Sequence, residues 1–168
     1  AMTELLPERW MEPPADPEVQ VQDTEANPMA PEQLSMEEAR KVAKYPLQEV
    51  SELPADVKLL GVSVNKPESG TAIDPSVVQF YQRGEKEAYL TVEQYAADPP
   101  GSKRAVARRD LALKLGKAVK VGDFDGVFVD RLGSRYLVWQ TAQTRIKITA
   151  SRPDLDETAL MEWAKKMR

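Results

Sequence analysis

The chain has 168 residues, of which 42% are hydrophobic and 30% are charged, and its net charge at pH 7 is −4. This size and composition fit one domain with an extension. The sequence contains no cysteine and no histidine, which excludes disulfides, thiolate nucleophiles, histidine acid–base catalysis and zinc sites built on these residues. The acidic balance argues against nucleic-acid binding.

The first 33 residues differ in composition from the remainder. They hold six of the 13 prolines and eight acidic residues against one basic residue, so their local charge is −7 and that of the other 135 residues is +3. Segments rich in proline and charge do not build a packed core. We therefore predict an arm or linker over residues 1–33 with few core contacts, and a globular domain over residues 34–168.

A helix and a series of hairpins follow in chain order. Ser35 and Glu38 form a capping-box pattern, which predicts a helix near residues 36–44, and a strand with apolar residues on one side follows near 60–64. Alternating apolar residues and turn residues then predict three antiparallel pairs. The expected strand pairs are 76–83 with 87–95, 117–122 with 127–131, and 135–141 with 144–149. We place the turn of the second pair at the Asp125-Gly126 step, because glycine accepts a positive φ.

Two further segments complete the predicted order. Residues 103–115 have a helical composition but alternate at their leucines, so we expect a helical turn over 103–109, an extended piece after it, and a stop at Gly116. The last helix, over residues 155–167, is expected to be capped by Asp154 and to bury Trp163. This order indicates an α+β fold: one antiparallel sheet of five to seven strands with the N- and C-terminal helices packed on one face.

Motifs for catalysis or cofactor binding are missing from the sequence. The chain has no Gly-x-Ser-x-Gly motif, no phosphate-binding glycine motif, and no complete calcium loop. Asp123, Asp125 and Asp130 surround one predicted turn, and we interpret them as a solvated hairpin end more readily than as a metal site. We therefore expect a protein that is not an enzyme and that needs no cofactor and no metal.

Two groups of residues are candidates for binding a protein or lipid ligand. The tyrosines Tyr81, Tyr89 and Tyr95 lie on adjacent predicted strands, and if Leu90 and Val92 face the core, Tyr89 and Tyr95 line an open sheet face. The second group is a basic cluster that could meet anionic headgroups, an acidic partner or the acidic arm. Its members are Lys103, Arg104, Arg108 and Arg109.

Residues 35–168 resemble a bacterial extracytoplasmic domain of unknown function found in anti-sigma factors and lipoproteins, which is distantly similar to lipoprotein-carrier and sigma-regulator domains. The resemblance rests on Ser35–Ala39, Leu53–Leu59, the glycines Gly122 and Gly126, Leu137–Trp139, and Leu160 with Ala164. It implies a cell-surface or periplasmic location and a membrane tether upstream. We therefore expect a non-catalytic sensor or interaction domain that binds a partner or ligand; the alternative is a lipid- or lipoprotein-carrier-like module with an apolar cavity.

Overall fold

The computed structural model describes residues 34–66, 74–85, 87–150 and 152–168, which all belong to one of the chain's two compact units, residues 33–168. The predicted arm over residues 1–33 lies outside the described residues. The described elements are α3 (Met36–Ala43), β1 (Val57–Asn65), β2 (Ser76–Arg83), β3 (Glu87–Ala96), α4 (Lys103–Leu115), β4 (Lys117–Val121), β5 (Phe124–Arg131), β6 (Ser134–Gln140), β7 (Thr144–Ala150) and α5 (Glu157–Lys165).

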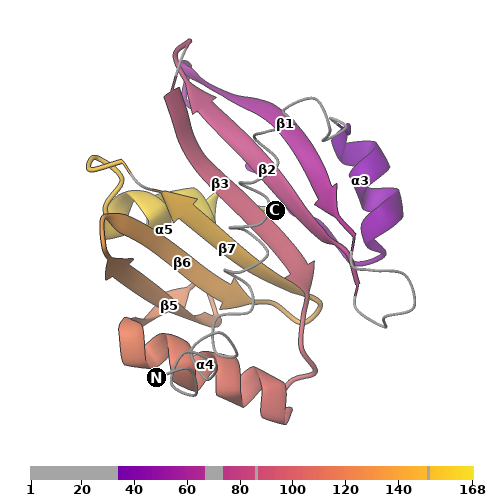
Figure 1. The fold of residues 1–168 in the computed structure, drawn as a ribbon, viewed down its shortest axis with the longest axis vertical. Coiled ribbons are helices and arrows are strands. Elements are labelled where there is room, and N and C mark those ends of the chain that lie inside the picture. The colour runs from indigo at the N-terminus through magenta and orange to yellow at the C-terminus, as the bar shows by residue number, and fades with distance from the viewer. Residues whose placement is uncertain (1–33, 67–73, 86, 151) are drawn as a thin grey trace, which may run out of the picture. The chain divides into compact units, whose positions relative to one another are not determined.

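The seven strands form one antiparallel sheet in the order β1-β2-β3-β7-β6-β5-β4 (Figure 1). Hairpins join β2 to β3, β4 to β5, β5 to β6 and β6 to β7, so most neighbouring strands are also neighbours in the chain. The exception is the central pair of β3 with β7, which joins the two groups of hairpins. The predicted α+β class, the antiparallel sheet and the three strand pairs are confirmed.

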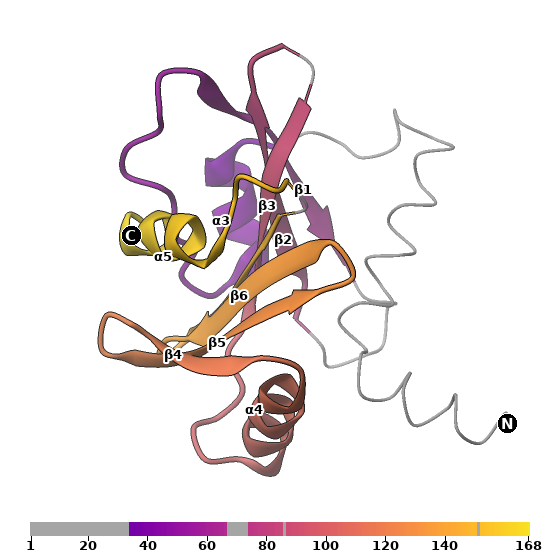
Figure 2. The same ribbon diagram turned by 90° about the vertical axis from the view of Figure 1, so that its left-hand side faces the viewer.

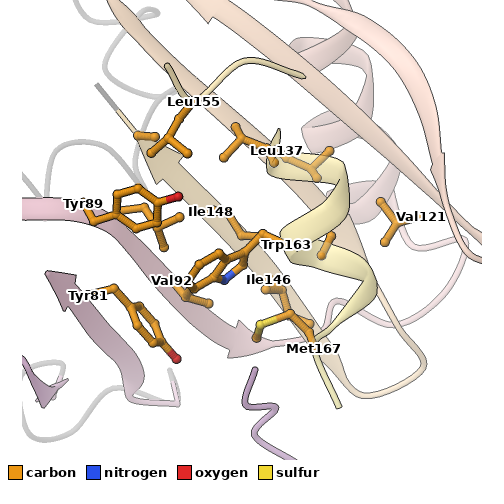
Figure 3. Packing of buried hydrophobic residues seen from close by; sticks show 14 of the residues in the cluster. Tyr81, Tyr89, Val92, Val121, Leu137, Ile146, Ile148, Leu155, Trp163 and Met167 are labelled. Atoms are coloured by element: carbon orange, nitrogen blue, oxygen red, sulfur yellow. The ribbon is translucent and has the colours of Figure 1, made fainter. Parts of the chain in front are cut away.

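The main hydrophobic core lies between the sheet and α5 (Figure 3). The Trp163 ring stands edge-on to Tyr81 with 5.1 Å between ring centroids, and it is tilted against Tyr89 at 5.7 Å. Leu160, one helical turn earlier, is fully buried. The prediction that Trp163 of the last helix packs into the core is therefore confirmed.

A smaller core lies beneath α3. Ala39 and Ala43 are fully buried against Val62 of β1 and Val77 of β2. The capping box is present, because the Glu38 amide donates to Ser35 Oγ at 3.1 Å and the Ser35 amide donates to Glu38 Oε1 at 3.0 Å. These bonds satisfy amides at the helix start, where no earlier turn offers carbonyl acceptors.

Both α3 and α5 contact β2. The Gln79 side-chain amide lies 3.4 Å from Met36 Sδ of α3, and the Tyr81 ring contacts Trp163 of α5. Figure 2 shows the two helices beside the sheet after a 90° turn from the view of Figure 1.

The segment that leads from α3 toward β1, residues 44–51, contacts β3 and residue 168, and we call it the strap. The Gln48 amide donates to Gln94 Oε1 at 2.8 Å, while Gln94 Nε2 donates to the Gln48 carbonyl at 2.8 Å. The strap then pairs with the last residue of the chain, since Glu49 and Arg168 exchange two backbone hydrogen bonds of 2.8 Å. Hydrogen bonds to a buried side-chain amide and to the chain end thus fix a segment without regular structure.

The structure corrects two predicted local features. The second hairpin turns at Gly122, which has a φ of 61°, whereas Gly126 lies inside β5 and pairs with Val119 and Trp139 on either side. The cap of α5 is Asp156, whose Oδ1 accepts from the Ala159 amide at 2.9 Å. Asp154 lies two residues before this cap, and its carboxylate pairs with the guanidinium groups of Arg152 and Arg83.

Residues 103–115 form one helix, so the predicted extended piece after residue 109 is wrong. The alternation of Leu111, Leu113 and Leu115 is compatible with a strand, but hydrogen bonding continues to Gly116, whose amide donates to the Ala112 carbonyl at 2.9 Å. The predicted stop at Gly116 is confirmed. A Cβ atom at this position would lie 2.1 Å from the Phe128 carbonyl oxygen, so the chain can leave the helix here only with glycine.

Candidate functional site

The expectation that the predicted tyrosines line an open face is wrong for Tyr81 and Tyr89, which are both buried in the core beside Trp163. Tyr81 faces the core because it lies opposite the core residue Leu90, whereas Tyr89 does so because of a bulge at the start of β3. Tyr81 pairs with Leu90 and the next residue of β2, Gln82, pairs with Ala88, so Tyr89 is left over in the register. An extra residue breaks the alternation of a strand, which takes Tyr89 out of the series that it would share with Tyr95.

Burial changes the acidity of these two phenols. Desolvation raises the pKa of Tyr81 to about 12, with a smaller contribution from the charge of Glu49. Desolvation also raises the pKa of Tyr89, and the Arg83 guanidinium, which lies 4.4 Å from the ring centroid, acts in the opposite direction. Both groups therefore stay neutral at physiological pH, in keeping with a role in packing.

Tyr95 lies on the other side of the sheet, in a group of charged and aromatic side chains. Its hydroxyl donates to Glu93 Oε2 at 2.6 Å, and Arg145 of β7 lies over its ring at 4.1 Å. In the next row Lys147 Nζ lies 4.6 Å from the centroid of the Tyr136 ring on β6. We call these five residues of β3, β7 and β6 the polar strip.

Sequence reasoning found only one member of the polar strip, although a signal for two others was present. In the segment 144–149 the isoleucines Ile146 and Ile148 alternate with Arg145 and Lys147. When the isoleucines face the core, the two cations must face the other side. Register then places Arg145 opposite Tyr95 and Lys147 opposite Glu93, and this pairing requires knowledge that β7 neighbours β3.

The predicted basic cluster lies entirely on α4, where the structure divides it into two kinds of residue. Arg108 Nε lies 2.9 Å from Asp98 Oδ2, and the Asp98 carboxylate is largely buried. Arg109 lies near Asp125, whose pKa is lowered chiefly by its hydrogen bond to Lys120 and more weakly by Arg109. Arg108 therefore serves a contact within the domain, and Arg109 is half-buried.

The ion pair of Arg108 continues into a backbone clamp. The Gln140 Oε1 atom accepts a hydrogen bond from the Asp98 amide at 3.2 Å, and Gln140 Nε2 donates to the Asp98 carbonyl at 2.9 Å. Gln140 thus fixes the loop after β3 to the end of β6, and Arg108 fixes α4 to that loop. These polar contacts link α4 to the loop after β3 and to the end of β6.

The remaining cations of α4 face away from the sheet. None of its 13 residues, all of which the structure describes, is buried. One side of the helix carries exposed cationic and apolar residues with one acidic residue among them, and we call it the outer surface of α4. Its residues are Lys103, Arg104, Val106, Ala107, Asp110 and Lys114.

The first turn of α4 has a charge opposite to the preference of an isolated helix. A helix N-terminus carries a partial positive charge and is stabilised by acidic residues. The first turn of α4 instead carries Lys103 and Arg104 and no acidic residue, although Ser102 caps it by accepting from the Ala105 amide at 3.2 Å. Val106 is 50% exposed in the same region. Neither feature stabilises the domain.

The chain has no significant match among family models, curated protein sequences or solved structures. Within the part of the chain that the structure describes, no three acidic side chains gather where they could hold a metal ion. No described helix is long and apolar enough to cross a bilayer.

Proposed function

We propose that residues 34–168 form a non-catalytic sensor or interaction domain, and that the outer surface of α4 contacts an anionic partner. The sheet with α3 and α5 on one face is the rigid support in this proposal, and α4 is the element that it presents. The resemblance described above suggests the setting: a bacterial protein at the cell surface or in the periplasm, tethered to the membrane. The domain would relay occupancy of α4 to the tether.

The observation that carries this proposal is the cationic first turn of α4. Lys103 and Arg104 are exposed at the end of the helix where cations are least favourable, and Val106 lies beside them. An anionic group approaching this turn would meet two cations and the helix dipole together. Binding would therefore convert an unfavourable local arrangement into a favourable one.

The carrier alternative receives less support from the packing. A carrier needs a continuous apolar cavity of several hundred cubic ångströms between sheet and helices. Beneath α5 this region is occupied by Tyr81, Tyr89 and Trp163, whose rings contact one another directly. We therefore place the carrier second to the interaction domain.

The test compares two double variants that remove the same charge. Lys103→Gln/Arg104→Gln alters the outer surface of α4, and Lys58→Gln/Lys165→Gln removes two exposed lysines elsewhere. Each protein is titrated with phosphatidylcholine vesicles, with vesicles that also contain phosphatidylglycerol, and with soluble polyglutamate. The two anionic probes distinguish a membrane surface from an acidic polypeptide.

We expect the α4 variant to lose affinity for at least one anionic probe, while the control variant binds like the parent. Each cation near an anionic surface contributes about 1 kcal/mol, so the loss should be about thirtyfold. Binding should also weaken with salt. Equal binding by both variants, or no binding of either anionic probe by the parent, would contradict the proposal.

A further inference from the structure

The two-residue hairpins at opposite ends of β5 have very different tips. Gly122 and Asp123 connect β4 to β5, while Leu132 and Gly133 connect β5 to β6. In the first tip glycine occupies the position of positive φ, as in a type II′ turn. In the second tip both residues have positive φ, 51° at Leu132 and 79° at Gly133, as in a type I′ turn.

Leucine is unsuited to this position of the turn. A type I′ turn favours asparagine, aspartate or glycine at its first central residue. At positive φ a larger side chain brings Cβ too close to the following carbonyl oxygen, and leucine cannot offset this cost with a local hydrogen bond as asparagine does. The local fold therefore does not explain the choice of Leu132.

Solvation does not explain the choice either. Leu132 is 94% exposed, the highest value among the large hydrophobic residues that the structure describes. Its side chain therefore gains almost nothing from burial in the isolated domain. A leucine held at positive φ, with no local hydrogen bond to offset the cost, points to a role outside the folding of this chain.

The base of the Leu132 hairpin is held firmly. Arg135 pairs with Asp130 across the two strands, with Nε 3.3 Å from the carboxylate Oδ2. Its Nη1 also donates to the Arg152 carbonyl at 3.1 Å. An apolar side chain on a rigid tip loses little conformational freedom when it binds, so it can act as a preorganised anchor.

We propose that Leu132 is the anchor of a second interaction surface and that it enters an apolar pocket of a partner protein. Arg131, which is exposed beside it, is placed to meet an acidic rim of that pocket. A protein pocket is favoured over a bilayer, because membrane binding scales with the apolar area inserted and a single leucine offers little of it. Protein interfaces, by contrast, concentrate binding energy in a few anchors. This surface is separate from α4 and does not depend on its proposed role.

The first test uses a photo-crosslinking residue, p-benzoylphenylalanine, placed at position 132 or at position 123 of the full chain. Asp123 is a matched control, because it occupies the tip of the other two-residue hairpin. The chain is expressed in its source organism and irradiated, and adducts are identified by mass spectrometry. We expect a discrete protein adduct from position 132, weak or absent from position 123 and reduced by Arg131→Glu. Equal adducts from both tips, no adduct, or adducts with lipid alone would overturn the proposal.

The second test measures the cost of the leucine directly. Leu132→Asn should raise the Tm by about 2–4 °C, because asparagine tolerates this backbone conformation. The same substitution should weaken binding of the crosslinked partner, once purified, about tenfold to a hundredfold, or about 1.4–2.8 kcal/mol at 1.4 kcal/mol per factor of ten. A fall in Tm would show that Leu132 serves the fold, and unchanged affinity would show that it is not an anchor.

Discussion

The helices α4 and α5 lie against the same sheet but are attached to it in different ways. α5 buries Leu160 and Trp163 in the main core, whereas no residue of α4 is buried. Polar contacts also tie α4 to the loop after β3, through the pair of Arg108 with Asp98 and the clamp of Gln140 on that loop. This difference indicates that α5 forms part of the main core, while α4 is held on the sheet with its outer surface available for contact.

The largest expected effect is at Trp163. Trp163→Ala removes a ring that packs against Tyr81 and Tyr89, so it should lower the free energy of unfolding by about 3–5 kcal/mol. Urea denaturation followed by circular dichroism measures this loss. A loss below about 1 kcal/mol would show that α5 is as peripheral as α4 and would remove the contrast between the two helices.

Gln94 and Gln140 each hold a backbone segment by two side-chain hydrogen bonds, so they compare polar contacts in the core with polar contacts beside α4. Gln94→Leu removes both bonds to the Gln48 backbone in a fully buried setting, so it should cost about 2–3 kcal/mol. Gln140→Leu makes the matched change beside α4, where the glutamine itself is only half-buried, and should cost about 1 kcal/mol. Denaturant midpoints of both variants provide the measurement. The reverse order of costs would contradict the view that α4 is the more loosely held helix.

A leucine of α4 should give a smaller loss of stability than either change above. Leu111 of α4 is half-buried, so Leu111→Ala should cost about 1 kcal/mol or less. Leu160→Ala is the control in α5, where complete burial predicts a cost of about 2–5 kcal/mol. Equal losses in thermal unfolding experiments would mean that α4 contributes to the core as much as α5 does.

The smallest expected effect depends on pH and concerns the start of α5. A hydrogen bond from Arg152, and more weakly the charge of Arg83, hold the pKa of Asp154 below its ordinary value. A carboxylate with a lowered folded pKa stabilises the protein above its unfolded pKa, and this contribution is lost as the pH falls through the folded value. Asp154→Asn should therefore lower the Tm slightly at pH 7 and leave it unchanged near pH ~2. A Tm difference that persists in acid would indicate a contribution other than charge.

The sequence was a reliable guide wherever periodicity and local chemistry agreed. The alternation of Arg145 to Ile148 predicted β7, and the Ser35 and Glu38 pair predicted the start of α3 with its hydrogen bonds. Trp163 was predicted as a core residue because it continues an apolar stripe. These features depend on residues close together in the chain, so no knowledge of strand order is needed to predict them.

The errors arose where the local sequence fitted more than one secondary structure, or where contacts between segments far apart in the chain determined the structure. Leu111, Leu113 and Leu115 fit a strand as well as a helix. Gly126 has the sequence context of a turn, but its absent side chain instead serves close contact with β4 and β6. The bulge that turns Tyr89 into the core depends on pairing with β2. The polar strip likewise depends on β7 lying beside β3, which no local pattern indicates.

The clamp between Gln94 and the strap has a consequence for how this protein can tolerate mutation. At residue 48 the Gln94 side chain bonds the backbone amide and carbonyl, which every residue except proline provides in full. The side chain at position 48 can therefore vary widely, while position 94 requires a side chain that both donates and accepts at this reach. Neutral drift should accumulate at position 48 of the strap and leave the glutamine beneath it unchanged.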